Sequence, residues 1–249
     1  MTRSLFFGIL GAILLLFSAI PTSAEEQNST YQVNLTNQGF KVAGESSVPG
    51  FFATWTGDVK DGFPNGQGSL QFYDNGKPGA RYEGNMLNGK INGKGILIRA
   101  NGDRIEGDWI NNIQNGKGIF YWANGDRYEG DFVNGEMSGK GIIIFASGDR
   151  YEGEFVDGKG TGKVIITKAN GDRFEYDSGK GIITFANGDR YEGDFVDNQI
   201  SGKGIYYWAN GNRYEGEVLN GKKNGKGIYY YHDGTVKEGR WDNDSYMGP

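Results

Sequence analysis

The residues that could carry out nucleophilic catalysis in this chain are very few. There is one histidine, His232, and no cysteine. A serine or cysteine nucleophile needs a neighbouring base that titrates near neutral pH, which is the usual role of histidine. His232 is followed by Asp233 and Gly234, a sequence typical of a turn. We therefore expect no catalytic residues of this kind, and neither a disulfide nor a lipid-modified cysteine.

Carboxylates are the more abundant candidates, with 31 Asp and Glu residues. Two of them could act as acid and nucleophile in glycoside hydrolysis, or could bind calcium together with turn carbonyls, for example around Asp189 and Asp194. These acids recur at the same positions of a repeat, however, whereas a catalytic pair should be unique. The acidic twelve-residue loop and the glycine-rich nonapeptide of known calcium sites are both missing. The sequence therefore predicts no enzyme, no metal and no cofactor.

The acids are positioned by a repeat of 23 residues. Its clearest part is the triplet Tyr, Glu, Gly at residues 128–130, which returns at 151–153. Degenerate copies lie at 55–57, 105–107 and 237–239, and a second signature, Gly, Lys, Gly, keeps the same phase. The repeat-signature tyrosines and glycines are Tyr82 and Gly84, Tyr128 and Gly130, Tyr151 and Gly153, Tyr191 and Gly193, and Tyr214 and Gly216.

Each repeat is predicted to form one β-hairpin. Residues 127–133 alternate charged and apolar side chains, and residues 141–146 are β-branched or aromatic, as in strands. Asn124 and Gly125 suit the positive φ angles of a tight turn between strands. Arginines and carboxylates then share one face, where we expect them to pair across neighbouring strands. On the other face, glycines such as Gly130 and Gly141 should let aromatic rings lie against the backbone.

One repeat is shorter than the others. The interval from Phe174 to Tyr191 is 17 residues, so six residues are missing. Because six is an even number, each side chain should keep its face and the sheet should continue through a shortened hairpin near residues 174–190. Two interpretations stay open, which are a kink between residues 160 and 180 and a tolerated deletion.

The ends of the chain differ from the repeats. Residues 1–24 predict a cleaved export signal, with Arg3, an apolar stretch over residues 5–20, and small residues before Glu25. The alternative is an uncleaved membrane anchor formed by residues 5–20, although this stretch is shorter than the roughly 20 residues that a span needs. A secreted or periplasmic location follows. Residues 25–50 predict a polar linker or capping segment, and residues 51–249 the repeat array.

This repeat closely resembles the MORN (membrane occupation and recognition nexus) repeat, over about residues 54–241. The resemblance implies an all-β fold, an elongated single-layer twisted antiparallel sheet of about eight stacked β-hairpins. It also implies a scaffold that binds a protein partner, with phospholipid headgroups or a homodimer as further possibilities. Plant phosphatidylinositol phosphate kinases carry such repeats beside a kinase domain, which is missing from this sequence.

One column of residues is the candidate binding surface, at the end of each second strand. It consists of Trp122, Phe145, Phe185, Trp208 and Tyr231. These rings could form the core of a thin sheet, or a groove for sugars, and a carbohydrate-binding module is therefore one alternative function. Phospholipid binding is another, although only Lys222 and Lys223 are adjacent basic residues in the repeats. The net charge of −5, with acids beside the arginines, argues against nucleic acid. The leading hypothesis is a non-catalytic protein-interaction scaffold.

Overall fold

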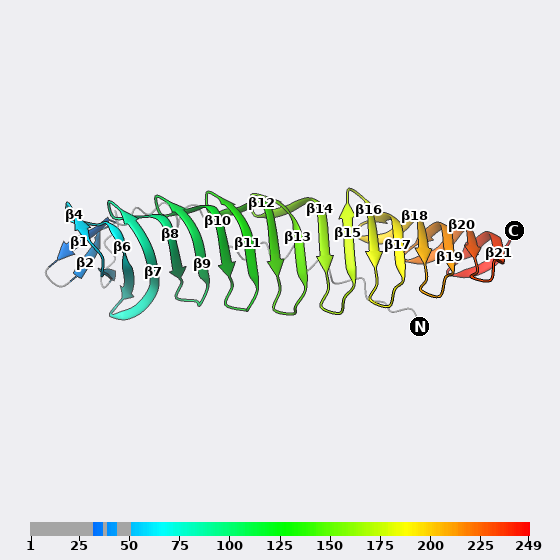
Figure 1. The fold of residues 1–249 in the computed structure, drawn as a ribbon, viewed down its shortest axis with the longest axis horizontal. Helices are drawn as coiled ribbons and strands as arrows, with labels where there is room; N and C mark the ends of the chain where they lie inside the picture. The colour runs from blue at the N-terminus through cyan, green and yellow to red at the C-terminus, as the bar shows by residue number, and fades with distance from the viewer. Residues whose placement is uncertain (1–31, 37–38, 44–50) are drawn as a thin grey trace. The chain divides into compact units, whose positions relative to one another are not determined.

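The structure, a computed structural model, describes residues 32–36, 39–43 and 51–249. These residues form strands and turns and include no helix (Figure 1). The described part of the chain divides into two compact units. The N-terminal unit holds its residues up to 146 together with 155–159, and the C-terminal unit holds 147–154 and 160–249. Each unit is an antiparallel sheet of successive hairpins, so the all-β hairpin fold predicted from the sequence is confirmed.

The N-terminal unit begins with two short strands in the segment predicted as a linker or cap. They pair with each other, and the second also pairs with β3. The strands of this unit are β1 (Gln32–Thr36), β2 (Gly39–Ala43), β3 (Phe51–Trp55), β4 (Val59–Lys60), β5 (Phe63–Pro64), β6 (Gly66–Asp74), β7 (Lys77–Leu87), β8 (Lys90–Ile98), β9 (Arg104–Ile110), β10 (Ile113–Tyr121), β11 (Arg127–Val133) and β12 (Glu136–Ile144). The predicted export signal lies outside the described residues.

In the C-terminal unit each strand from β14 to β22 pairs with the next one along the chain. These strands are β14 (Lys159–Thr167), β15 (Arg173–Asp177), β16 (Lys180–Thr184), β17 (Arg190–Val196), β18 (Gln199–Tyr207), β19 (Arg213–Leu219), β20 (Lys222–Tyr230), β21 (Val236–Asp242) and β22 (Ser245–Gly248). They follow β13 (Arg150–Val156), whose residues are divided between the two units.

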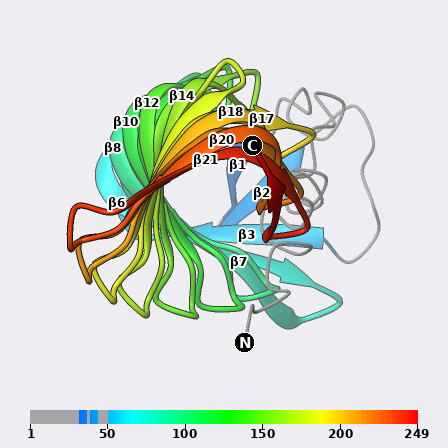
Figure 2. The ribbon, with the colours of Figure 1, turned by 90° about the vertical axis from the view of Figure 1, so that its right-hand side faces the viewer.

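The strands of the C-terminal unit are curved along their length, as Figure 2 shows for the orange and red strands β20 and β21. The pairing of β17 with β18 shifts register between Gly193 and Phe195, and that of β19 with β20 between Gly216 and Val218. Such bulges bend a strand and increase its local twist. The position of the repeat glycines therefore sets where each hairpin bends.

Two different turns connect the strands, which corrects part of the prediction. Asn134 and Gly135 both have positive φ, 52° and 84°, and form the tight two-residue turn after the Tyr-Glu-Gly strand. The predicted pair Asn124 and Gly125 instead belongs to a wider turn closed by the Trp122 amide, which donates to the Asp126 carbonyl at 3.0 Å. Only the glycine of that pair has positive φ, because the Asn124 side chain accepts a hydrogen bond from the Asp126 amide and holds the turn open.

The tyrosine of each repeat lies against glycine, as the sequence predicts. Tyr191 is fully buried, and a Cβ placed on Gly204 would lie 2.6 Å from the Cζ atom of this ring. The Tyr191 hydroxyl donates to the Asp194 carbonyl at 3.1 Å. Its ring centroid lies 4.7 Å from that of Tyr206 and 5.6 Å from that of Phe195. Burial raises the pKa of Tyr191 to about 12. We call this side of the sheet the aromatic face.

The shortened hairpin keeps the register of the sheet. Phe174 pairs with Ile183, which pairs with Tyr191, so the aromatic face passes through β15 and β16 without a change of side. Its turn is again a two-residue one, at Ser178 and Gly179 with φ of 47° and 84°. The even number of missing residues therefore has the effect on side-chain direction that the sequence predicts.

The arginine and glutamate side chains do not pair across strands, contrary to the prediction. The arginine that precedes the Tyr-Glu-Gly position pairs with the glutamate two residues further along its own strand, as Arg190 does with Glu192 at 2.7 Å. The cross-strand neighbours of Arg190 are Thr184 and Tyr207, and the Tyr207 ring lies 5.5 Å from the guanidinium carbon. Because neither neighbour carries a charge, the glutamate of the same strand is the partner. Cross-strand pairs are made by lysine instead, for example Lys117 with Asp131 at 2.9 Å.

Candidate binding groove of the C-terminal unit

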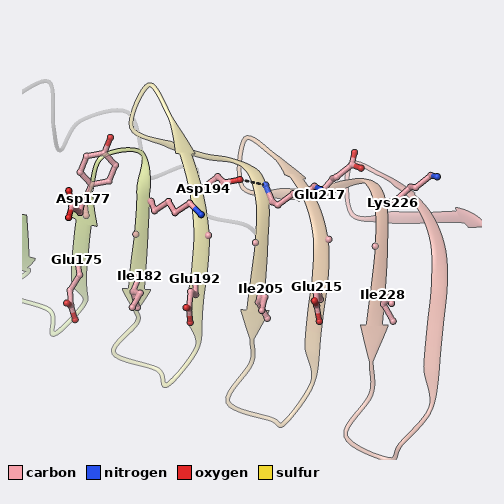
Figure 3. A pocket seen from close by; sticks show the side chains of 18 of the residues that line it. Glu175, Asp177, Ile182, Glu192, Asp194, Ile205, Glu215, Glu217, Lys226 and Ile228 are labelled. Atoms are coloured by element: carbon pink, nitrogen blue, oxygen red, sulfur yellow. Dashed lines mark hydrogen bonds between the residues drawn. The ribbon is translucent and has the colours of Figure 1, made fainter. Parts of the chain in front are cut away.

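A groove runs across the strands of the C-terminal unit from β14 to β21, with a volume of about 1650 Å³. It lies on the side of the sheet opposite the aromatic face, where the charged residues of the repeats point. Figure 3 looks onto this groove and shows that its side chains come from neighbouring strands in parallel lines. We call this side of the unit the groove face.

The first line on the groove face alternates acid and isoleucine from strand to strand. Glu192 pairs with Ile205, which pairs with Glu215, and the same alternation continues on both sides. Figure 3 shows these residues as one row. In strand order the line is Glu175, Ile182, Glu192, Ile205, Glu215, Ile228 and Glu238. The line therefore offers carboxylates and apolar contacts in a fixed order.

The second line consists of glycines. Gly193, Gly204 and Gly216 are direct register partners, and the line continues through Gly227 and Gly239. A Cβ on Gly204 or Gly227 would collide with a tyrosine ring of the aromatic face, so the missing side chains belong to that face. On the groove face these positions expose backbone between the first and third lines, as any residue that points to the aromatic face would.

The third line carries lysines and acids. Lys203 pairs in register with Glu217, and Lys226 with Arg240. In the described part of the chain neither lysine takes part in an ion pair, whereas Lys94 and Lys117 of the N-terminal unit pair with Asp108 and Asp131. The reason at Lys203 is that Asp194 accepts the backbone amide of this residue, at 2.9 Å, rather than its ammonium. The groove therefore contains lysines that a ligand could neutralise.

Three glutamates of the first line, Glu175, Glu192 and Glu215, form ion pairs. Glu192 and Glu215 have side chains about half exposed, at 50% and 49%. Glu175 is held by Arg173 and also by Lys163, at 3.4 Å, and hydrogen bonding to Arg173 lowers the pKa of this carboxyl, against a smaller opposing effect of burial. Glu192 and Glu215 are thus alike in exposure and in their arginine partner, whereas Glu175 has two cationic partners.

The predicted aromatic column lies outside this groove. Its members are the first residues of the wider turns, as the hydrogen bonds of Trp122, Phe185, Trp208 and Tyr231 show. They are half-buried, and Phe185 and Trp208 pack against the core of the C-terminal unit. Trp208 is stacked on Tyr206 with centroids 5.7 Å apart and lies 5.3 Å from Tyr229. The structure thus gives these rings a packing role, and ligand binding by the column stays a prediction.

Lys223 has surroundings that its sequence does not reveal. Its ammonium lies 5.2 to 6.0 Å from the ring centroids of Trp208, Tyr214, Tyr229 and Trp241, and 3.4 Å from an Asp244 carboxylate oxygen. Its side chain is only 14% exposed. Other repeats have an apolar residue here, such as Met137 or Ile200. Lys223 is therefore not available to a lipid headgroup, although Lys222 is exposed.

A further feature was not predicted from the sequence. The last residue before most of the tight turns is a large aliphatic residue with about half of its surface exposed. These residues are Leu87, Ile110, Val133, Val156, Val196 and Leu219. Alternation along a strand places them on the same side as the charged residues. The signal was present in the sequence, as an apolar residue directly before an Asn or Asp that is followed by Gly or Asn.

The described residues contain no group of three or more His, Asp or Glu side chains that could hold a metal ion. His232 is exposed in a turn, where its amide donates to Asn212 at 2.9 Å. Nor does any described helix reach the length and hydropathy needed to cross a membrane.

The fold and the groove define a β-hairpin repeat protein. The MORN repeat model matches eight segments, at residues 55–77, 82–104, 106–127, 128–150, 151–173, 178–190, 191–213 and 214–236. The chain belongs to the MORN repeat family. The shortest match, 178–190, is the shortened hairpin.

Comparison with solved structures gives more distant similarities. The TCP10 domain of Danio rerio CPAP is 13% identical, covers 77% of this chain and 90% of its own, and has a TM-score of 0.43. The TCP domain of Drosophila melanogaster SAS-4, in complex with a proline-rich motif of Ana2, is 16% identical, covers 59% of this chain and 83% of its own, and has a TM-score of 0.40. Comparison with curated proteins gives no significant match.

Proposed function

We propose that this protein is a non-catalytic scaffold, exported by its N-terminal segment, whose groove in the C-terminal unit binds an extended segment of a partner protein. The observation that carries the proposal is the groove itself, which is lined by equivalent residues from successive hairpins. Repetition of the same acid, isoleucine and glycine in each hairpin suits a long ligand that makes the same contact several times. A small substrate would need one distinctive cluster instead.

The proposal is supported by the chemistry of the lining. Half-buried isoleucines, glycine backbone and charged side chains of both signs together resemble the composition of protein interfaces, which combine apolar contact with hydrogen bonds. The aromatic face offers less, because its largest rings are buried against glycine. Partner binding by the terminal edge strand, or formation of a homodimer, would leave the groove free and is therefore separable by experiment.

The test is a peptide-display selection against the full chain, followed by binding measurements with two variants. Ile205→Trp fills the groove at its centre, and Ile119→Trp makes the same change at the equivalent position of the N-terminal unit. We expect the selected peptides to lose most of their affinity for the Ile205→Trp variant and to keep it for the control. Unchanged binding to the Ile205→Trp variant would contradict the proposal.

The two alternatives from the sequence remain predictions with tests of their own. Phospholipid binding requires that the protein sediments with anionic liposomes, and its weakness is that Lys223 is enclosed by rings and Asp244. Carbohydrate binding by the aromatic column requires a change in tryptophan fluorescence when glycans are added, since Trp122 and Trp208 belong to the column. Neither result is expected if the groove is the binding site.

A further inference from the structure

The spacing of the groove carboxylates sets a length scale for any ligand that contacts them in turn. Glu175, Glu192, Glu215 and Glu238 lie on every second strand of the C-terminal unit. Adjacent strands are about 4.8 Å apart, so neighbouring carboxylates of this line recur at roughly 9.6 Å. Over three intervals the line extends about 29 Å.

A polyproline II segment has the same period. It has three residues per turn and rises about 3.1 Å per residue, so every third side chain recurs at about 9.3 Å and nine residues span roughly 28 Å. A β-strand repeats its side chains on one face at about 6.7 Å, which does not match. The heptad of an α-helix repeats at about 10.5 Å and would be out of register by almost 3 Å over the same three intervals.

The glycine line is suited to the backbone of such a segment. Gly193, Gly204 and Gly216 are partly exposed, and their side-chain positions point to the aromatic face, so a strip of backbone is open to a ligand beside the carboxylates. A polyproline II segment makes no internal hydrogen bonds, and its carbonyl groups remain available for donors of the groove. The half-buried isoleucines between the carboxylates supply apolar contact for the intervening residues.

Charge decides which side chain occupies the repeated position. Glu192 and Glu215 are half exposed, and each already accepts from one arginine of its own strand. An ionised carboxylate has room for further donors on its two oxygens. Lys203 and Lys226 stand across the glycine line on the intervening strands, where they would repel a cation, whereas Asp194 and Glu217 stand there on the strands of Glu192 and Glu215. A basic ligand side chain is therefore directed towards the strands that carry the carboxylates.

We propose that the groove binds a protein segment in the polyproline II conformation that carries a basic side chain at every third residue. This inference rests on the proposed function and specifies the class of partner. Three consecutive basic residues of that spacing would meet Glu192, Glu215 and Glu238. The arginines beside Glu192 and Glu215 weaken the attraction of these single contacts, so affinity depends on the repeated match.

The test uses fluorescent twelve-residue peptides of identical composition, each with eight prolines and four lysines. One has lysine at every third position, and the other has its four lysines together at one end. Circular dichroism first verifies that both adopt polyproline II. Binding to the full chain is then measured by fluorescence anisotropy at fixed ionic strength. We expect the periodic peptide to bind at least tenfold more tightly than the clustered one.

Two double variants identify the site. Glu192→Gln with Glu215→Gln removes two groove carboxylates, and we expect it to weaken the periodic peptide at least fivefold. The control is Asp157→Asn with Asp197→Asn, which changes the net charge by the same amount at two tight turns outside the groove. Asparagine tolerates the positive φ of these positions, as Asn134 and Asn220 show in the corresponding turns of other repeats. This control should bind as the unaltered protein does.

The outcomes separate the inference from the proposed function. If the two peptides bind with equal affinity, and the Glu192→Gln, Glu215→Gln variant binds both of them more weakly, the period of three is overturned. The same result would support a groove that binds extended basic segments. Absence of binding by the periodic peptide would overturn the inference alone, since the display selection tests the groove with peptides of any sequence. Equal loss of affinity in the Asp157→Asn, Asp197→Asn control would show that only net charge matters.

Discussion

Replacing Gly204 by alanine tests the packing on which both faces of the C-terminal unit depend. A Cβ at this position would lie 2.6 Å from Tyr191 Cζ, about 1 Å closer than ordinary van der Waals contact allows. The Tyr191 ring cannot simply move away, because it is fully buried and bounded by Phe195 and Tyr206. Either the surrounding core shifts or the tyrosine leaves its site.

Each response has a cost that can be worked out from the structure. Overpacking of a core costs about 1 to 3 kcal/mol. Expulsion of Tyr191 forfeits its hydrogen bond to the Asp194 carbonyl, about 1 kcal/mol, and the burial of its ring, about 1.5 to 3 kcal/mol. Gly204 does not have a positive φ, so alanine also restricts the unfolded chain and returns about 0.4 to 1 kcal/mol. We expect a net destabilisation of about 2 to 3 kcal/mol.

The assay is urea unfolding with two readouts. A repeat protein can unfold one segment at a time, so tryptophan fluorescence is combined with hydrogen exchange of the β17 to β20 amides. Gly79→Ala is the control, because the nearest atom to its Cβ is the Phe72 carbonyl oxygen at 3.7 Å and its φ is ordinary. Unchanged stability and exchange in Gly204→Ala would refute the reasoning. If Tyr191→Phe is combined with Gly204→Ala, the two losses should not add, since both act on one ring.

Three further predictions use other parts of the structure. Burial raises the pKa of Tyr191 and of Tyr214 to about 12, above the unfolded value of 10.0, so the stability that they contribute is present below pH 10 and is lost as the pH rises through 12. Circular dichroism and tyrosinate absorbance measured against pH should show unfolding between pH 10 and 12. Unfolding that is complete below pH 10 would contradict this prediction. Lys223→Ala should destabilise the C-terminal unit by about 1 to 3 kcal/mol in thermal unfolding, since it empties the space between four rings. Lys223→Met, which copies Met137, refills this space and should differ from the unaltered protein by less than about 1 kcal/mol, because Asp244 still accepts the backbone amide of residue 223. Gln114 is 4% exposed and its Nε2 has no hydrogen-bond partner, so Gln114→Met should raise the free energy of unfolding of the N-terminal unit by about 1 kcal/mol. A lower midpoint of urea unfolding in this variant would show that the amide is hydrogen-bonded in the native protein.

The features of the fold that could be predicted are those that recur in several repeats of the sequence. The phase of tyrosine and glycine predicted the hairpins, the side on which rings pack and the continuity of the shortened repeat, because alternation along a strand is a local property. The two Asn-Gly turns could not be distinguished in this way. Both Asn124 and Asn134 precede glycine, and the difference arises from the hydrogen bond between the Asn124 side chain and the Asp126 amide.

The groove could not be predicted from the sequence, for a physical reason. The rings of the predicted aromatic column are prominent in the sequence, whereas the groove is formed mostly by glycine backbone and by common charged residues. Which face of a hairpin becomes hollow depends on bulges such as the one between Gly193 and Phe195, and periodicity gives no information on their direction. Lys223 was equally hidden, since its partner Asp244 lies 21 residues further along the chain.

The two faces of the array are under different constraints, and this difference bears on where binding specificity can reside. On the aromatic face Tyr82, Tyr128, Tyr191 and Tyr214 each lie over two glycines, so substitutions there act first on stability. On the groove face the third line already varies between the units, from Lys117 paired with Asp131 to Lys226 opposite Arg240. Such changes alter the charge offered to a ligand without disturbing the core. Partner choice can therefore be set by the groove lines alone, and exchanging Arg240 for Asp should change ligand preference while leaving the unfolding midpoint nearly unaltered.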